Sequence, residues 1–220
     1  MKKFIVNAIA GCLFFQLAAQ DLPVKEQPGQ PDKPLIFLVS GDGGLKGFTV
    51  SLCNAIHDNG YSITSMDARS YFWDKKTPEQ TADAIAGYIS AALRQKANRH
   101  WVMIGYSFGG DITPFVVNRL PDSLRSQLTN VILLSPSTST DFEIHFSDML
   151  GIGKKRSMDV IAEINRLTVS KTTLLFGEDE NSFPLGQIKL PNYNSGIIKG
   201  GHHFDGDFRA VAARLCAEIR

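Results

Sequence analysis

The chain has 220 residues, of which 43% are hydrophobic and 20% are charged, and its formal net charge is +1. A chain of this length and composition is expected to form one globular domain with a large core. The near-neutral charge and the lack of a basic run or an acidic tail argue against nucleic acid as a partner, and they favour a small-molecule or lipid substrate.

The N-terminus has the pattern of a targeting segment. Two lysines precede an apolar run that reaches Ala19, and this run is too short and interrupted for a membrane span but typical of a secretory signal. We therefore predict export by a signal peptide over residues 1–19. The alternative is lipoprotein processing at Cys12, because residues 9–12 resemble a lipobox. Residues 20–33 are polar and rich in proline, which predicts a linker outside the fold.

From residue 34 to residue 220, predicted strands alternate with predicted helices. Most of the strands are continuous apolar runs, typical of strands covered on both faces, and they are expected at 35–39, 61–66, 101–104, 131–134, 172–176 and 197–199. Helical spacing of apolar residues predicts helices at 47–58, 77–96 and 208–219, and another after residue 107 that ends at Pro121. A longer segment at about 136–168 is expected to be a small cap insertion with a helix near 158–167. This alternation predicts an α/β fold: a mostly parallel sheet of about six strands with helices on both faces.

A candidate nucleophile follows the third predicted strand. The residues Gly105-Tyr106-Ser107-Phe108-Gly109 fit the G-x-S-x-G pattern of a nucleophile elbow. A serine on such a sharp turn has a strained backbone, and the two glycines remove Cβ atoms that would collide there. Ser107 is therefore the candidate nucleophile, and the amide of Phe108 is a candidate donor to an oxyanion. A loop that merely connects a strand to a helix fits the same five residues.

The first predicted core strand ends in the glycine-rich sequence Ser40 to Gly44. A hydrolase of this build supplies its second oxyanion-hole amide at this point, and glycines let the backbone approach the substrate. Asp42 or Gly43 is the candidate donor. A phosphate-binding loop fits less well, because the spacing matches neither the Walker pattern nor G-x-G-x-x-G.

Two later strands end in residues that complete a catalytic set. Glu180 follows one strand at the favoured spacing after a glycine, with Asp179 as the alternative acid. The last strand leads to His202, with His203 as the alternative base. The order serine, acid, histidine is that of α/β-hydrolases, and this chemistry requires no cofactor.

A metal site is the competing interpretation of the histidines. His145, His202 and His203 with Asp205 would be its ligands, although the chain has no established zinc-binding spacing.

Aromatic residues also follow the second predicted strand, at Tyr71, Phe72 and Trp73. Aromatic side chains most often pack in a core. Three in a row cannot all point inward, so at least one is expected to line the substrate cleft.

Five motifs resemble the bacterial virulence protein VirJ family, which also forms the C-terminal domain of AcvB. They are SGDGG at Ser40, YFWDKKTPEQTA at Tyr71, GYSFGGD at Gly105, DFEIH at Asp141 and GGHHFDGD at Gly200. The resemblance spans roughly residue 35 to the C-terminus. It implies a periplasmic α/β-hydrolase that cleaves the aminoacyl ester of lysyl-phosphatidylglycerol, with peripheral membrane contact. An exported, non-catalytic binding module of the same fold is the alternative.

The implied substrate and fold lead to two further expectations. A lysyl ammonium would require a carboxylate in the cleft, and Asp111, Asp141 and Glu143 are the acids nearest to the motifs. Asp111 also fits a plain acid in the first turn of a helix. Cys53 and Cys216 lie on helices that pack side by side in α/β-hydrolases. Export favours a disulfide between them, while their apolar neighbours favour two buried thiols.

Overall fold

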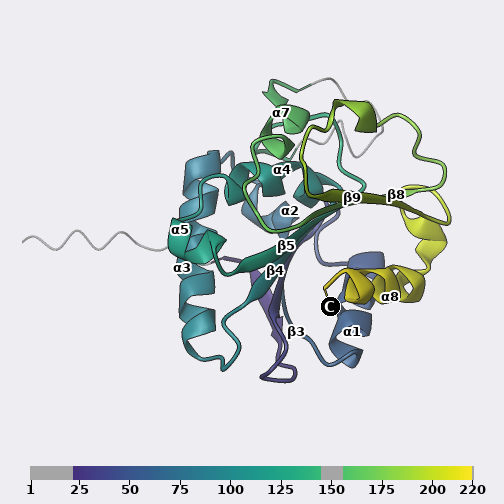
Figure 1. Cartoon of the computed structure of the whole chain (residues 1–220). Coiled ribbons are helices and arrows are strands. Elements are labelled where there is room, and N and C mark those ends of the chain that lie inside the picture. Colours follow the sequence, from purple (N-terminus) through teal and green to yellow (C-terminus); the bar gives the residue numbers. More distant parts are fainter. Residues whose placement is uncertain (1–21, 145–155, 220) are drawn as a thin grey trace, which may run out of the picture.

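Seven strands form the central sheet of the computed structural model, which describes residues 22–144 and 156–219 (Figure 1). Their spatial order is β1 (Val24–Gln27), β3 (Ser62–Met66), β2 (Leu35–Val39), β4 (Trp101–Tyr106), β5 (Leu128–Leu134), β8 (Thr172–Gly177) and β9 (Tyr193–Ile198). Every neighbouring pair is parallel except β1 and β3. The predicted α/β fold and its six strands are confirmed. β9 begins four residues before the predicted strand. The prediction relied on apolar runs and missed the first half of β9, which is polar and exposed at the sheet edge.

β1 corrects the prediction that residues 20–33 form a linker outside the fold. Val24–Gln27 pairs antiparallel with β3, with Val24 opposite Met66. An edge strand has a partner on one side and faces solvent on the other, so it needs no continuous apolar run. Lys25 and Glu26 are exposed there, and this polar composition hid the strand.

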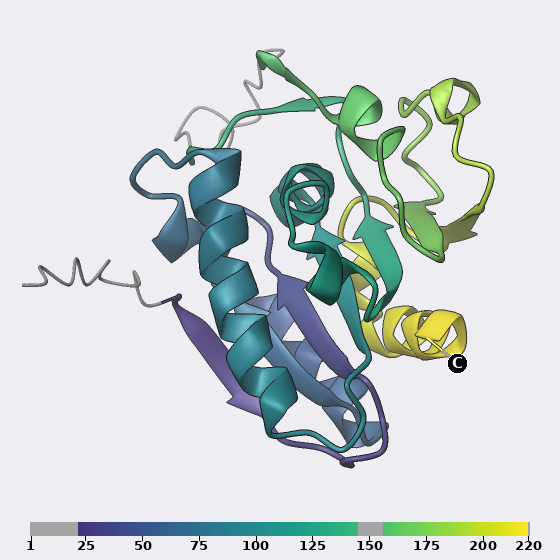
Figure 2. The ribbon, with the colours of Figure 1, turned by 60° about the vertical axis from the view of Figure 1, so that its left-hand side comes forward.

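Helices cover both faces of the sheet (Figures 1 and 2). One face carries α1 (Gly47–Asp58) and α8 (Phe208–Ile219), which pack side by side. The other face carries α3 (Pro78–Arg94), α4 (Phe108–Val117), α5 (Asp122–Arg125) and α7 (Val160–Ile164). Short turns of helix are α2 (Ala68–Tyr71), η1 (Leu185–Gln187) and η2 (Phe204–Gly206). Within residues 22–144 and 156–219, no helix is long and apolar enough to span a bilayer.

The start of α3 shows how local sequence sets an element boundary. The Thr77 side chain accepts a hydrogen bond from the Gln80 amide at 3.2 Å, and the Gln80 side chain accepts one from the Thr77 amide at 3.0 Å. These two hydrogen bonds form a capping box, whose residue types and spacing are visible in the sequence, and Pro78 occupies the first helical position.

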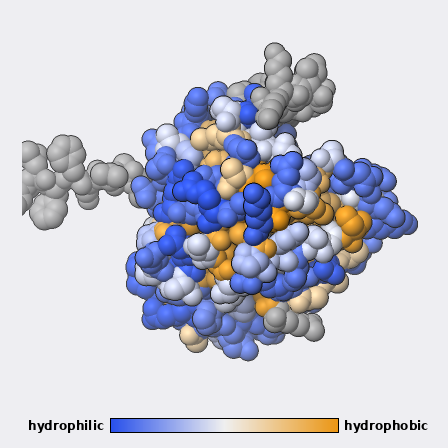
Figure 3. Space-filling model, turned by 45° about the horizontal axis from the view of Figure 1, so that its top comes forward, coloured by the Kyte–Doolittle hydropathy of each residue, from blue (hydrophilic) through white to orange (hydrophobic). Residues whose placement is uncertain are grey.

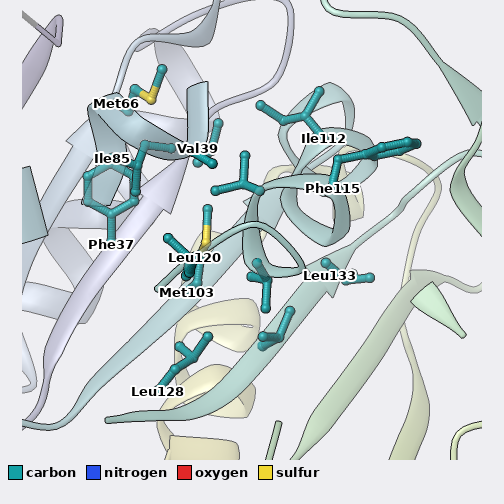
Figure 4. Packing of buried hydrophobic residues seen from close by; sticks show 14 of the residues in the cluster. Phe37, Val39, Met66, Ile85, Met103, Ile112, Phe115, Leu120, Leu128 and Leu133 are labelled. Atoms are coloured by element: carbon teal, nitrogen blue, oxygen red, sulfur yellow. The ribbon is translucent and has the colours of Figure 1, made fainter. Parts of the chain in front are cut away.

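Two clusters of buried side chains lie on the two faces of the sheet. Successive strand residues point to opposite faces, so Phe37 joins the cluster under α3 and α4 while Leu38 joins the cluster under α1 and α8. Figure 4 shows the larger cluster, to which Phe115 of α4, Ile85 of α3 and Met103 of β4 belong. Each such fully buried side chain contributes about 1.5–3 kcal/mol to folding.

The predicted cap at about 136–168 is described only in part. Its residues form the two-stranded antiparallel ribbon of β6 (Ser139–Thr140) and β7 (Met158–Asp159), followed by α7. The helix predicted near 158–167 is shorter than expected, at Val160–Ile164. Backbone hydrogen bonds from Lys76 to Phe142 and from Ile144 to Phe72, both 2.9 Å, tie the first part of the segment to the loop before α3. Residues 1–21 and 145–155, with the predicted signal peptide, Cys12 and His145, lie outside the described residues.

Cys53 and Cys216 lie on the two helices that pack side by side, as expected. Both residues are buried, and no disulfide joins them. Burial raises the pKa of the Cys53 thiol to about 11, so the thiol stays protonated and unreactive at neutral pH. The disulfide expected as one alternative is therefore absent.

Candidate active site

Ser107 lies on a sharp turn between β4 and α4, with φ 53° and ψ −121°. A positive φ is uncommon for residues other than glycine and marks a backbone held in place by its surroundings. The Ser107 amide donates to the Leu134 carbonyl at 2.8 Å, and the Asp111 amide donates to the Ser107 carbonyl at 3.0 Å. The strained elbow predicted from G-x-S-x-G is present.

Both glycines of the elbow leave room for backbone. A Cβ atom on Gly105 would lie 2.3 Å from the Gly109 carbonyl oxygen, and one on Gly109 would lie 2.2 Å from the Val39 carbonyl oxygen. Contacts this short do not occur between real atoms, so a side chain at either position would push α4 away from the strands. The two glycines thus allow the N-terminus of α4 to pack closely against the ends of β2 and β4.

A chain of hydrogen bonds joins Ser107, His202 and Glu180. His202 Nε2 lies 2.8 Å from Ser107 Oγ, and His202 Nδ1 lies 2.6 Å from Glu180 Oε1. The other Glu180 oxygen accepts hydrogen bonds from the Ser135 hydroxyl at 2.5 Å and the Gly177 amide at 2.7 Å. The three side chains follow β4, β8 and β9, because the carboxyl ends of parallel strands meet at one edge of the sheet.

Charge fixes the direction of these hydrogen bonds. Burial alone would raise the pKa of Glu180, but hydrogen bonds from His202, Ser135 and Gly177 outweigh it and hold the pKa below its usual value. An ionised carboxylate only accepts, so Nδ1 of His202 carries the proton and Nε2 accepts from the Ser107 hydroxyl. Hydrogen bonding to Glu180 raises the pKa of His202, although burial opposes it. The imidazolium that forms on proton transfer is therefore stabilised.

The alternative base and acid lie elsewhere. Nδ1 of His203 lies 2.7 Å from the hydroxyl of Tyr106, and the Asp179 carboxylate lies beside Gly201, 3.7 Å from the position of a Cβ on that glycine. The structure thus brings His202 and Glu180 to Ser107, and it places His203 and Asp179 in other contacts.

Backbone amides next to Ser107 are available to an oxyanion. The turn from Gly41 to Gly44 closes with a 3.0 Å hydrogen bond between their backbones. Within the part of the chain that the structure describes, the amides of Asp42, Gly43 and Phe108 donate to no other group. A Cβ on Gly41 would lie 3.3 Å from the Ser107 Cβ, so this turn touches the serine. Free amides of this turn and of the start of α4 are thus available next to the serine, where an oxyanion would form.

A cavity of about 580 Å³ opens at Ser107. The Gly41–Gly44 turn, the start of α1, Tyr106 and both histidines line it. Its volume suits a small organic group. Among the described residues, no three His, Cys, Asp or Glu side chains are grouped so that they could hold a metal ion.

The predicted aromatic contacts need correction. Phe72 is fully buried and Tyr71 is 5% exposed, so neither lines a cleft. The short helix α2 turns both inward, and Phe72 packs edge-on against Phe108 with ring centroids 5.2 Å apart. Trp73 is 53% exposed but does not line the cavity. The inference that three consecutive aromatics cannot all point inward holds, yet the cleft prediction was wrong for Tyr71 and Phe72.

The predicted acidic contacts also lie outside the cavity. Asp111 is buried, and its carboxylate accepts hydrogen bonds from the Ser137 amide at 2.5 Å and the Ser137 hydroxyl at 2.8 Å. Asp141 lies 3.8 Å from Arg156, and Glu143 does not line the cavity. The carboxylate that does line it is Asp42, for which the sequence suggested only a backbone role. The sequence feature that could have predicted this role is the position of Asp42 beside Gly41, in the same glycine-rich turn.

This fold, with a serine, a histidine and an acid at the ends of parallel strands, defines the α/β-hydrolase class. The family model described as Bacterial virulence protein (VirJ) matches residues 33–220, and the chain belongs to this family. The resemblance predicted from the motifs is confirmed.

Solved esterases and peptidases share the fold at low sequence identity. Est1E from Butyrivibrio proteoclasticus, with bound ferulic acid, is 16% identical with a TM-score of 0.63, and the match covers 90% of this chain and 94% of that chain. Proline iminopeptidase from Mycobacterium smegmatis is 14% identical with a TM-score of 0.63, covering 89% and 94%. Naproxen esterase from Bacillus subtilis is 16% identical with a TM-score of 0.57, covering 93% and 94%. No curated protein matches the chain.

Proposed function

We propose that this protein is a serine hydrolase that cleaves carboxylic esters. The observation that carries the proposal is the hydrogen-bonded chain from Glu180 through His202 to Ser107 at the mouth of a cavity. The strained serine and its hydrogen-bonded histidine are the arrangement that acyl transfer requires.

The geometry supports a two-step reaction. Ser107 Oγ attacks the ester carbonyl carbon while its proton passes to Nε2 of His202, and Glu180 stabilises the imidazolium. The amide of Phe108 and that of Asp42 or Gly43 donate to the oxyanion, and each such donor is worth about 3–4 kcal/mol in the transition state. The tetrahedral intermediate collapses, and the leaving alkoxide takes the proton from His202. A water molecule, deprotonated by His202, then hydrolyses the acyl-serine ester.

We infer that the particular substrate is lysyl-phosphatidylglycerol or a related aminoacyl lipid, cleaved at its aminoacyl ester in the periplasm. Membership of the VirJ family supports this substrate through the resemblance stated above. Among the described residues, the large hydrophobic side chains that are exposed are Trp73 and Ile197. Figure 3 shows further hydrophobic areas set between hydrophilic residues on one side of the molecule, and peripheral contact with a membrane would bring such areas against lipid.

The experiment compares wild type with Ser107→Ala on p-nitrophenyl butyrate and then on total membrane lipids. Wild type is expected to release p-nitrophenol, and the variant is expected to lose at least about a thousandfold in kcat. Mass spectrometry of the lipids identifies the species that wild type consumes. If wild type binds lipid without turning over any ester, the non-catalytic binding module is the better description.

A further inference from the structure

Asp42 lines the cavity with Ser107 and His202, and its charge acts on His202 and on Tyr106. Nothing in the described ranges forms a hydrogen bond or an ion pair with this carboxylate. Lys46 lines the same cavity but does not pair with Asp42. The charge of Asp42 is therefore left for a group that enters the cavity.

Other acids near the serine already have partners. Glu180 holds His202, and Asp111 accepts two hydrogen bonds from Ser137. Asp42 differs because its position in the Gly41–Gly44 turn points to contact with the substrate rather than to support of the fold.

An unpaired carboxylate at this position works against an uncharged ester. The tetrahedral intermediate develops negative charge at the amides of Phe108 and Asp42 or Gly43, and a like charge nearby raises the energy of that state. The charge of Asp42 does reach the catalytic groups. Hydrogen bonding to Glu180 raises the pKa of His202 most, and the charge of Asp42 adds to it. A cationic group next to the ester carbonyl would cancel this penalty.

We propose that the Asp42 side chain binds the α-ammonium group of an aminoacyl ester, so that the site selects this ester over its uncharged counterpart. The α-ammonium is one carbon from the ester carbonyl, and the Asp42 carboxylate is on a residue of the turn that presents amides to the carbonyl oxygen. One turn thus contacts both groups. This inference rests on the proposed ester hydrolase function. It replaces Asp111, Asp141 and Glu143 as the carboxylates for a substrate cation.

The test uses three glycerol esters, which share a leaving group and differ in the presence and position of an ammonium group. Alanylglycerol carries an α-ammonium, 6-aminohexanoylglycerol carries a distal ammonium, and propionylglycerol carries none. Asp42→Asn removes the charge and keeps the backbone amide. We expect its kcat/KM for alanylglycerol to fall about ten- to a hundredfold, the range for one hydrogen bond to a charged group. The values for the other two esters are expected to stay the same or to rise.

Glu178→Gln is the matched control, since this exposed acid lies outside the cavity and the substitution removes the same charge. It is expected to leave the ratio of the three kcat/KM values unchanged, and thermal melting checks that both variants are folded. An equal change on all three esters in Asp42→Asn would overturn this inference alone. A larger loss on 6-aminohexanoylglycerol than on alanylglycerol would overturn the assignment to the α-ammonium. Failure of wild type to cleave any ester would instead contradict the proposed function, and this inference with it.

Discussion

The hydroxyl of Tyr106 lies 2.7 Å from Nδ1 of His203 and donates to the carbonyl of His202 at 3.2 Å. The Tyr106 ring also stacks on the His202 ring, with centroids 5.9 Å apart. The residue before the nucleophile thus holds the loop that carries the base. This contact gives the two adjacent histidines different environments: His203 bonds to the tyrosine, and His202 faces Ser107.

The two histidines are expected to differ sharply on substitution. His202→Ala removes the group bonded to Ser107, so kcat on p-nitrophenyl butyrate should fall about 10⁴- to 10⁶-fold. His203→Ala should keep kcat within about tenfold of wild type, because it loses one hydrogen bond to Tyr106 and none to Ser107. An inactive His203→Ala beside an active His202→Ala would reverse the assignment.

The two candidate acids offer a second comparison. Glu180→Gln keeps the shape of the side chain but removes the charge that orients His202, so kcat should fall about 10³- to 10⁴-fold. Asp179→Asn removes a charge from the residue directly before Glu180. Its carboxylate lies beside Gly201, so this variant should have a small effect on kcat. Steady-state kinetics on one ester decide the matter, and comparable losses in both variants would contradict the role of Glu180.

Activity should depend on pH through His202. The base must be neutral to accept the Ser107 proton, and hydrogen bonding to Glu180 raises the pKa of His202 above its ordinary value of about 6.5. Below that raised pKa the ring is protonated, so kcat/KM should rise with pH and level off above it. The residual activity of Glu180→Gln should show its inflection at lower pH, because the partner that favours the charged ring is gone. An unchanged inflection would mean that another group controls the profile.

Gly105→Ala is expected to destabilise the protein. The added Cβ would lie 2.3 Å from the Gly109 carbonyl oxygen and 2.5 Å from Thr113 Oγ1, so α4 must shift. The cost is about 3 kcal/mol or more, which lowers Tm by about 6–12 °C in a domain of this size. Gly87→Ala is the control: a Cβ on this exposed residue of α3 meets nothing within 4 Å. It should stabilise the helix by about 0.5–1 kcal/mol. Differential scanning calorimetry of both variants and wild type measures these changes in Tm.

Asp111 should make stability depend on pH. Burial raises the pKa of Asp111 from 3.8 to about 7, against the hydrogen bonds from Ser137. Between these two pKa values the folded state binds more protons than the unfolded chain, so the free energy of unfolding should fall as pH rises, by up to about 4 kcal/mol. Asp111→Asn removes this titration. Urea unfolding at pH 4.5 and pH 8 should therefore show a smaller decrease for the variant, and identical decreases would contradict the raised pKa.

The local features of this protein could be predicted from its sequence. Continuous apolar runs predicted the buried strands because strands covered on both faces exclude polar residues. The G-x-S-x-G spacing predicted the elbow because strained backbone at Ser107 needs glycines at Gly105 and Gly109. The capping box at Thr77 likewise depends on residues three positions apart. In each case the cause lies within a few neighbouring residues, or in their burial alone.

Only the tertiary structure decided which groups meet. Ser107 and His202 are 95 residues apart in the chain, and the choice of His202 over His203 depends on Tyr106 reaching the second ring. The edge strand β1 exists because β3 offers unpaired backbone groups, which no pattern within residues 24–27 reveals. The burial of Phe72 also depends on side chains brought from distant segments, and so does the lack of a partner for Asp42 among residues 22–144 and 156–219. Such distances follow from the packing of helices on the sheet, whereas sequence patterns report the preferences of one segment at a time.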